Sequence, residues 1–374
     1  MAGLYLHIPF CAKACTYCDF HFSTSLRTKP DVLTAMHMEL EQRAAELNGT
    51  PVGTIYFGGG TPSRLTDAEL QAFLDQARSL LSVQTDAEVT LEVNPDDVDV
   101  ERLAFWQATG ITRLSIGVQS FRDERLAFMG RAHDAAQSRE SLGLLADAGF
   151  TSWTMDLIYG LPGMTLEEWD EQLSIALSHA PPHISAYCLT VEERTVLDHQ
   201  VRKGLVSMPG DGDQAVQFAH LIDRLEAAGY AQYEISNFAR QGHHSRHNSS
   251  YWSGMPYLGI GPSAHSFDGR TRRWNVAHNV HYARGVQGGE RYWEEETLTP
   301  AQCANEALLT GLRTAAGVDL DALPMTLGKQ ASSIIARHRS HGLIEQQGAR
   351  LILTRAGRAF ADRIAADLFI TDDR

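Results

Sequence analysis

Short apolar runs alternate with amphipathic stretches along the first 230 residues of this 374-residue chain. The apolar runs predict strands over residues 4–8, 54–57, 89–93, 113–118, 154–158 and 184–189. The stretches around them predict helices over residues 31–47, 67–81, 99–108, 135–148, 166–178 and 213–228. Strands that alternate with helices form a parallel sheet with right-handed crossovers. Six such units are fewer than the eight of a closed TIM barrel, so we predict an α/β fold with a partial (β/α)6 TIM-type barrel.

The composition changes after this barrel region, which we assign to residues 1–230. Residues 231–298 are rich in Gly, His, Asn, Tyr and Trp and show little periodicity, so we treat them as an extension. In residues 299–374, helical patterns and a turn between two apolar runs predict a small helical, winged-helix-like C-terminal domain. This domain carries 9 Lys and Arg against 8 Asp and Glu, which favours a packing or docking role over DNA binding.

The loops after the predicted strands are rich in glycine, proline and polar residues. They cover residues 58–62 (GGGTP), 92–95 (EVNP), 119–120 (QS) and 159–162 (YGLP). In parallel sheets and barrels, ligands bind at the carboxyl ends of the strands. These loops therefore predict a ligand site at that end of the barrel.

Three of the five cysteines, Cys11, Cys15 and Cys18, follow the first predicted strand with the spacing C-x3-C-x2-C. Three thiolates can hold three irons of a four-iron, four-sulfur (4Fe-4S) cluster and leave the fourth iron open. A structural zinc site is the alternative, because His21 could complete a Cys3His ligand set. The remaining two, Cys188 and Cys303, stand alone and are expected to be small buried side chains.

The cysteine spacing and the Gly-Gly-Gly-Thr-Pro loop resemble the radical S-adenosylmethionine (SAM) superfamily. That resemblance implies an open iron that chelates SAM and an electron transfer that yields a 5′-deoxyadenosyl radical. A closer resemblance, to the family of oxygen-independent coproporphyrinogen III oxidases and HemW heme chaperones, runs over nearly the whole chain. It is carried in order by residues 5–11 (YLHIPFC), 58–62, 92–95, 117–121 (GVQSF), 130–131 (GR) and 156–162 (DLIYGLP).

The resemblance also implies which residues contact SAM. They are Tyr5, Tyr17, Gly59, Gly60, Thr61, Glu92, Gln119, Arg131 and Asp156. Carboxylates can accept hydrogen bonds from ribose hydroxyls, and an arginine can pair with the SAM carboxylate. Glycines lack a Cβ atom and let the backbone approach a ligand closely, so a side chain added at Gly59 is expected to occupy ligand space.

Three features bear on the choice between oxidase and chaperone. The oxidases carry a further cysteine two positions after the third one, where this chain has Phe20, and they carry an N-terminal segment that we do not expect here, since ten residues precede Cys11. Residues 247–252 (HNSSYW) resemble the H-N-x-x-Y-W motif of the HemW group, which is associated with heme binding. The resemblance implies heme contact through His247, because a neutral imidazole is a good axial ligand. The alternatives in the same region are His243, His244, His265, His278 and His281.

We therefore predict a heme chaperone that carries a 4Fe-4S cluster and SAM, binds heme and transfers it to acceptor hemoproteins, membrane respiratory proteins among them. The alternatives are an oxygen-independent coproporphyrinogen III oxidase and, third, a zinc-stabilised interaction protein. Whether the chain is an enzyme, and whether it forms a homodimer, stays open at this point.

Composition limits the partners and the location. A formal net charge of -14 excludes a general nucleic-acid binder, and no apolar run reaches the roughly 20 residues of a membrane span. The chain start lacks the pattern of a signal peptide, so we expect a cytoplasmic location. The G-x-G-x-x-A pattern at residues 259–264 includes Pro262 and no βαβ unit surrounds it, which argues against a nicotinamide site.

Overall fold

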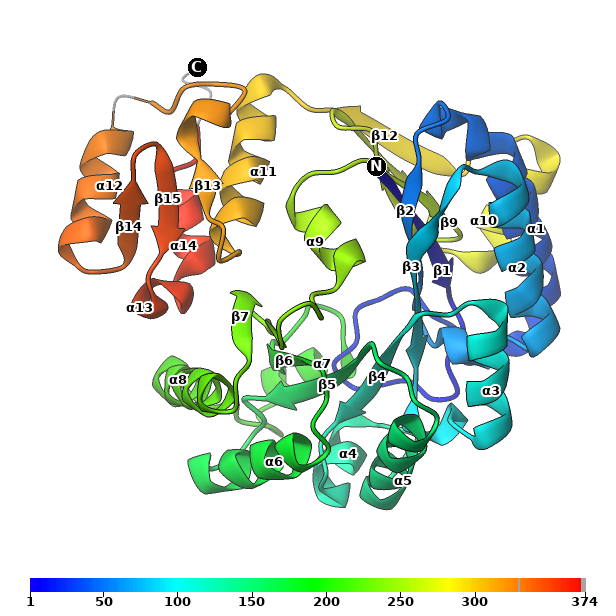
Figure 1. Cartoon of the computed structure of the whole chain (residues 1–374), viewed down its shortest axis with the longest axis horizontal. Coiled ribbons are helices and arrows are strands. Elements are labelled where there is room, and N and C mark those ends of the chain that lie inside the picture. The colour runs from blue at the N-terminus through cyan, green and yellow to red at the C-terminus, as the bar shows by residue number, and fades with distance from the viewer. Residues whose placement is uncertain (329, 371–374) are drawn as a thin grey trace.

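The computed structural model describes residues 1–328 and 330–370, and its largest feature is a curved sheet (Figure 1). Six parallel strands, paired in chain order, make up the middle of this sheet. They are β1 (Ala2–Ile8), β2 (Val52–Gly59), β3 (Val83–Val93), β4 (Arg113–Gln119), β5 (Trp153–Tyr159) and β6 (His183–Cys188). All six predicted strands are present, and the predicted partial (β/α)6 barrel is confirmed.

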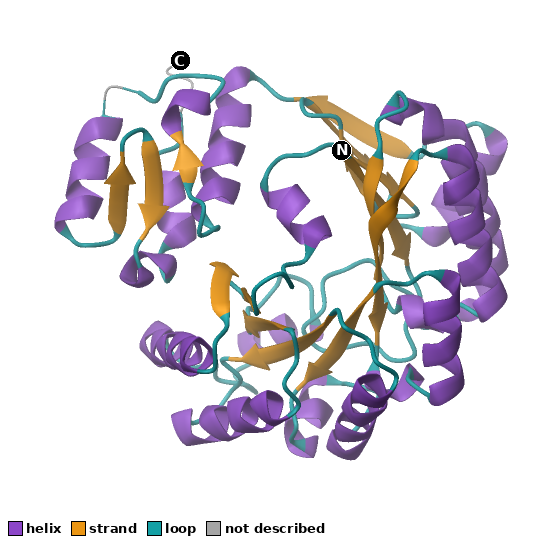
Figure 2. Cartoon of the chain, in the orientation of Figure 1, coloured by secondary structure: helices purple, strands orange, loops and turns teal. Residues whose placement is uncertain are grey.

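Helices follow these strands, and most of them cover the outer face of the sheet (Figure 2). They are α1 (Lys29–Arg43), α2 (Asp67–Leu80), α3 (Val100–Thr109), α4 (Asp123–Met129), α5 (Ala135–Asp147), α6 (Leu166–Ser178), α7 (Val196–Arg202) and α8 (Asp211–Ala227). The helix predicted over residues 31–47 is α1 followed by a 3-10 turn, Ala44–Leu47. Helices α4 and α7 were not predicted, since seven residues are too few to show a helical period.

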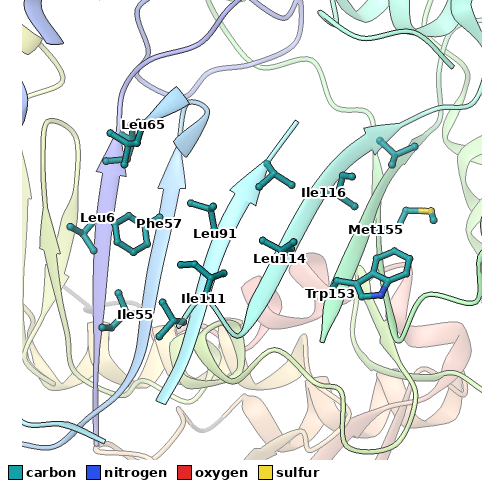
Figure 3. Packing of buried hydrophobic residues seen from close by; sticks show 14 of the residues in the cluster. Leu6, Ile55, Phe57, Leu65, Leu91, Ile111, Leu114, Ile116, Trp153 and Met155 are labelled. Carbon is teal, nitrogen blue, oxygen red and sulfur yellow. The ribbon is translucent and has the colours of Figure 1, made fainter. Parts of the chain in front are cut away.

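The alternation of the strand residues explains how the sheet packs. In β1, Leu4, Leu6 and Ile8 are fully buried in the layer between the sheet and its helices. Figure 3 shows this layer, in which Leu6, Phe57 and Leu91 from the successive strands β1, β2 and β3 lie side by side. Because neighbouring side chains of a strand point to opposite faces, Tyr5 and His7 face the inner side of the barrel. The inner face is therefore free to carry polar side chains.

Residues 231–298 extend the sheet at both of its ends. At one end, β7 (Ala231–Glu234) and β8 (Asn237–Ala239) continue past β6. At the other end, β9 (Tyr257–Ile260) pairs in parallel with β1 and is followed by β10 (His265–Phe267), β11 (Thr271–Asn275) and β12 (Trp293–Thr297). These strands have three to five residues, too few to give a visible period, so the sequence did not predict them.

Two helices of the extension have different surroundings. Helix α10 (Asn279–Gly288) packs against α1 on the outer face. Helix α9 (Arg246–Trp252) instead contacts β2 and lies on the open side of the barrel, facing the C-terminal domain (Figure 1). The segment that carries the H-N-x-x-Y-W motif therefore faces the interior of the molecule.

The C-terminal domain has its own small core, formed by residues that include Leu308, Leu312, Leu351 and Ile364. Its helices are α11 (Pro300–Leu312), α12 (Ala331–Ser340), α13 (Arg355–Arg358) and α14 (Ala361–Asp367), and its three-stranded sheet has the order β13 (Val318–Asp319), β15 (Arg350–Leu353) and β14 (Ile344–Gln347). The hairpin of β14 and β15 is the predicted wing. In the described part of the chain, no helix combines the length and the apolar character that a bilayer span requires.

Candidate functional site

A cavity of about 440 Å³ opens at the carboxyl ends of the parallel strands. Of the twelve residues predicted for the cluster and SAM, all except Tyr5 line it. They are Cys11, Cys15, Cys18, Tyr17, Gly59, Gly60, Thr61, Glu92, Gln119, Arg131 and Asp156. The strand-end rule explains most of this gathering, since the cysteines, the glycines, Thr61 and Gln119 end a parallel strand or lie on the loop after it. Glu92 and Asp156 reach the cavity from within β3 and β5, and Arg131 from the segment after α4.

The three cysteines lie on the loop after β1, which is fixed by backbone hydrogen bonds. The N–H of Cys11 donates to the oxygen of Ser23 at 3.0 Å, and the N–H of Thr16 donates to the oxygen of Met129 at 2.9 Å. All three thiols are free and half-buried. Burial raises the pKa of the Cys11 thiol, and it raises that of Cys18 to about 12. Metal binding would favour their thiolate forms, because a coordinating thiol is deprotonated.

The geometry favours a cluster over zinc. His21, the fourth zinc ligand considered above, is engaged elsewhere, because its Nε2 lies 2.7 Å from Oδ1 of Asn279. Within the described residues, no three His, Cys, Asp or Glu side chains converge on a position that a single metal ion could occupy. Three separated thiols around a cavity fit a cluster, in which each thiolate binds a different iron.

Arg131 places a positive charge beside the cysteine loop. Its Nη2 donates to Oδ1 of Asn94 at 2.7 Å and to the oxygen of Gly117 at 2.9 Å, and its Nη1 lies 3.5 Å from Sγ of Cys15. Its buried Nε atom has no hydrogen-bond partner. The guanidinium is thus held in a fixed orientation beside the thiols with a donor to spare, as the binding of a ligand carboxylate requires.

Two carboxyl groups lie on the inner wall of the same cavity. Glu92 accepts a hydrogen bond from the hydroxyl of Tyr56 at 2.7 Å, and Asp156 accepts one from Ser115 at 3.0 Å. Burial raises the pKa of Glu92 from 4.5 to about 7, and the charge of Asp156 adds to this effect. Burial likewise raises the pKa of Asp156 to about 6. The Oδ1 atom of Asp156 is buried without a partner, so it is available to a hydroxyl donor on a ligand.

The raised pKa of Glu92 predicts a pH-dependent stability. The folded chain keeps a proton that the unfolded chain releases above pH 4.5, so stability falls as the pH rises from 4.5 to about 7. Glu92→Gln removes this loss, and the free energy of unfolding at pH 8 is expected to rise by up to about 3 kcal/mol over the unchanged chain. Urea unfolding at pH 5 and pH 8 measures it.

The matched control for this prediction is Glu101→Gln, which changes an exposed carboxylate on α3. It is expected to leave the pH dependence as it is. A stability difference between Glu92→Gln and the unchanged chain that stays constant from pH 5 to pH 8 would contradict the assignment. Glu92→Gln is also expected to bind SAM more weakly, because an amide offers one acceptor oxygen instead of two.

The glycines of the loop after β2 have close protein neighbours, whereas a side chain added at Gly59 was expected to occupy ligand space. Gly59 has φ +105°, and a Cβ atom there would lie 2.6 Å from the His7 ring rather than in the cavity. At Gly60, a Cβ would lie 2.8 Å from the oxygen of Ile8 and 3.0 Å from Sγ of Cys11. These glycines therefore allow the cysteine loop to pack on β2, and a side chain at Gly59 would disturb that packing before it reached a ligand.

Tyr5 and His247 lie apart from the cavity, in the barrel interior. The hydroxyl of Tyr5 lies 3.2 Å from Nδ1 of His7. The ring of His247 is stacked on Tyr56 with centroids 4.8 Å apart, and its Nδ1 lies 2.9 Å from Oγ1 of Thr54. Burial lowers the pKa of His247 to about 4, so its imidazole is neutral. The ring of His247 also stacks on that of Tyr5, with centroids 6.4 Å apart, and neither residue lines the cavity with the other predicted site residues.

Some residues of the cavity wall were missed by the sequence analysis. Asn94, Ser115 and Gly117 hold Arg131 or Asp156, and Cys188 lines the cavity although it was expected to be an unremarkable buried side chain. Cys188 ends β6, so the rule that ligands bind at strand ends was a signal that could have identified it.

Comparison with known proteins shows the family of this chain and supports the fold. Residues 5–174 match the family model of the radical SAM superfamily, and residues 298–360 match that of the HemN C-terminal domain. The first match includes the cysteine loop and all of the predicted SAM contacts.

Two relatives illustrate how far the similarity extends. The heme chaperone HemW of Mycobacterium tuberculosis is 38% identical over 371 residues, which cover 98% of this chain and 94% of the relative. The heme chaperone HemW of Bacillus subtilis is 33% identical over 372 residues, which cover 97% of this chain and 98% of the relative. Both similarities include the barrel, the extension and the C-terminal domain.

A solved structure shares the same architecture. Coproporphyrinogen III oxidase (HemN) from Escherichia coli, described as a radical SAM enzyme, superposes with a TM-score of 0.85 over 98% of this chain and 90% of that chain. The sequences are 24% identical, so this similarity concerns the fold.

Proposed function

Because this chain belongs to the HemW family of heme chaperones, within the radical SAM superfamily, we propose that it binds heme and transfers it to acceptor hemoproteins. The observation that carries the proposal is the similarity to two HemW proteins over nearly the whole chain, the H-N-x-x-Y-W segment included. Membrane respiratory proteins are the proposed acceptors. A cytoplasmic location suits the free cysteines, which stay reduced in that compartment.

We further propose that Cys11, Cys15 and Cys18 hold a 4Fe-4S cluster and that the same cavity binds SAM. When bound, such a cluster supplies an open iron for the methionine part of SAM and one electron to its sulfonium. Arg131 is oriented to pair with the SAM carboxylate, since three of its contacts already fix its guanidinium. Glu92 and Asp156 face the cavity from β3 and β5 and can accept hydrogen bonds from ribose hydroxyls.

Phe20 supports the chaperone over the oxidase. Its side chain is 64% exposed and lines the mouth of the cavity, at the position where the oxidases carry a further cysteine. A phenyl ring offers no thiol for acid–base or hydrogen-atom chemistry. The residues around the cavity can therefore hold the cofactors without the group that the oxidases add.

Two measurements on one cluster-loaded sample test this function. We expect the chain to bind heme with a stable absorption band, to pass it to a heme-free hemoprotein, and to form no protoporphyrinogen from coproporphyrinogen III with SAM and a reductant present. Carbon dioxide release at a rate typical of an enzyme, on the order of 1 per second, would instead establish the oxidase. Absence of both heme binding and turnover would contradict the proposed function.

A further inference from the structure

A second cavity, of about 1060 Å³, lies between the open side of the barrel and the C-terminal domain. Its walls come from the end of α9, from β9 and β10, and from α11 and the region of β13 (Figure 1). It shares no lining residue with the cavity at the cysteines. Cavities of this kind at a domain boundary are a common place for large cofactors and ligands.

Aromatic side chains form one wall of this second cavity. Tyr251 and Trp252, the last two residues of the H-N-x-x-Y-W motif, have ring centroids 5.3 Å apart. Tyr251 is 49% exposed and lies 5.6 Å from Tyr257, which in turn lies 6.5 Å from Phe267. Four connected aromatic rings give an extended apolar surface that a flat macrocycle can cover.

His265 is the histidine of the extension that lines this cavity. Its imidazole is exposed on one side, stacks on Trp274 with ring centroids 6.2 Å apart, and forms no hydrogen bond within the described part of the chain. Burial of one side and the charge of Arg272 lower its pKa, so the ring is neutral and a nitrogen lone pair is available. His247 differs, because its Nδ1 is engaged with Thr54 and its ring is covered by Tyr56.

Arginines supply positive charge at the rim of the same cavity. Arg272 pairs with Glu306, and Arg313 pairs with Asp362 and lies over the Trp252 ring. Arg270 also lines the cavity, and its guanidinium forms no ion pair among the described residues. An arginine without a partner beside an apolar wall is suited to bind a carboxylate.

One wall residue of this cavity also has a buried polar atom without a partner. The indole Nε1 of Trp252 is buried and has no hydrogen-bond partner, although Trp252 lines the cavity. Buried donors of this kind are nearly always satisfied in folded proteins. A ligand that carries an acceptor would satisfy it.

We propose that this second cavity is the heme site, with His265 as the axial ligand, the aromatic wall under the porphyrin and Arg270 on a propionate. This inference rests on the proposed heme-chaperone function and deepens it. It assigns the H-N-x-x-Y-W motif a different role from the one expected. Tyr251 and Trp252 contact the macrocycle, while His247 fixes α9 to the barrel interior through Thr54.

Hemin titration of the full, cluster-loaded chain, followed by difference absorbance, tests the site. His265→Ala is expected to shift the heme band and to weaken binding by about tenfold or more, and free imidazole should restore the band. His278→Ala, which removes a histidine outside the cavity, is the matched control and should bind as the unchanged chain does. His247→Ala should keep the band position, since this ring does not reach the iron in the proposed site.

The remaining variants distinguish an error in the assigned heme site from an error in the proposed function. Arg270→Ala should weaken binding of heme more than binding of heme dimethyl ester, whose propionates are blocked. Cys303, which also lines the cavity, is the rival ligand, and Cys303→Ala should leave the band in place. An unchanged band in His265→Ala, or a lost band in His247→Ala or Cys303→Ala, would overturn the assignment while heme binding stands. If the unchanged chain binds no heme, the proposed function itself fails.

Discussion

Replacement of Cys11, Cys15 or Cys18 by serine is expected to remove most of the iron from the reconstituted chain, together with the broad cluster absorbance. A hydroxyl is a much poorer ligand for iron than a thiolate, and a cluster with three protein ligands has none to spare. The loss should be similar for each cysteine, because all three line the same cavity. Iron and acid-labile sulfide per chain, after anaerobic reconstitution, measure it.

The other two cysteines are the matched controls. Cys303→Ser changes a thiol in the second cavity and should leave the iron content intact. Cys188→Ser is the stricter control, since its thiol lines the cluster cavity at the end of β6. Full iron content in any of the three loop variants would rule out the cluster assignment, and loss of iron in Cys188→Ser would make Cys188 a further ligand.

The barrel and the cofactor cavity were largely predictable from the sequence. Apolar runs that alternate with amphipathic stretches predict β1 to β6, because buried parallel strands appear in a sequence as short, nearly continuous apolar runs. Once the strands are parallel, the loops after them meet at one edge of the sheet. This is why Cys11, Glu92 and Asp156, far apart in the chain, could be expected around one cavity.

The extension was not predictable in the same way. Its strands are short, so hydrophobic periodicity does not identify them. The position of His247 depends on the packing of α9 against β2, which no local pattern encodes. The motif marks this segment in the sequence, but it cannot tell which of its side chains face the barrel interior and which face the second cavity.

Hydrogen bonds to one buried carboxylate, that of Glu39, hold this extension to the barrel. Glu39 of α1 is fully buried, and its carboxylate accepts hydrogen bonds from Arg43 at 2.9 Å, the N–H of Gly261 at 2.9 Å, Asn275 at 2.8 Å and Tyr282 at 2.6 Å. Three of these four donors belong to the extension. Nothing in the helical pattern of α1 distinguishes Glu39 from an ordinary surface glutamate, so only the structure shows this role.

Glu39→Ala is accordingly expected to lower the free energy of unfolding by about 3–5 kcal/mol, because Gly261, Asn275 and Tyr282 lose a fully buried acceptor and buried Arg43 keeps only Glu46 as a counter-charge. Urea unfolding measures the change. Glu41→Ala, which removes an exposed glutamate of the same helix, should alter stability by less than about 0.5 kcal/mol. If Glu39→Ala also lowered the free energy of unfolding by less than about 0.5 kcal/mol, the hydrogen bonds of Glu39 would contribute little to stability.

The double variant Glu39→Met with Arg43→Leu separates charge from packing. Removing both charges leaves no buried cation that has lost a partner, so the double variant should be more stable than Glu39→Ala, although Gly261, Asn275 and Tyr282 still lose their acceptor. The network also bears on heme, since Arg43 donates to Ser266, the neighbour of His265 on β10. If His265 is the axial ligand, the double variant should bind heme less tightly even where its fold is retained. Normal heme affinity in that variant would mean that β10 keeps its position without the network.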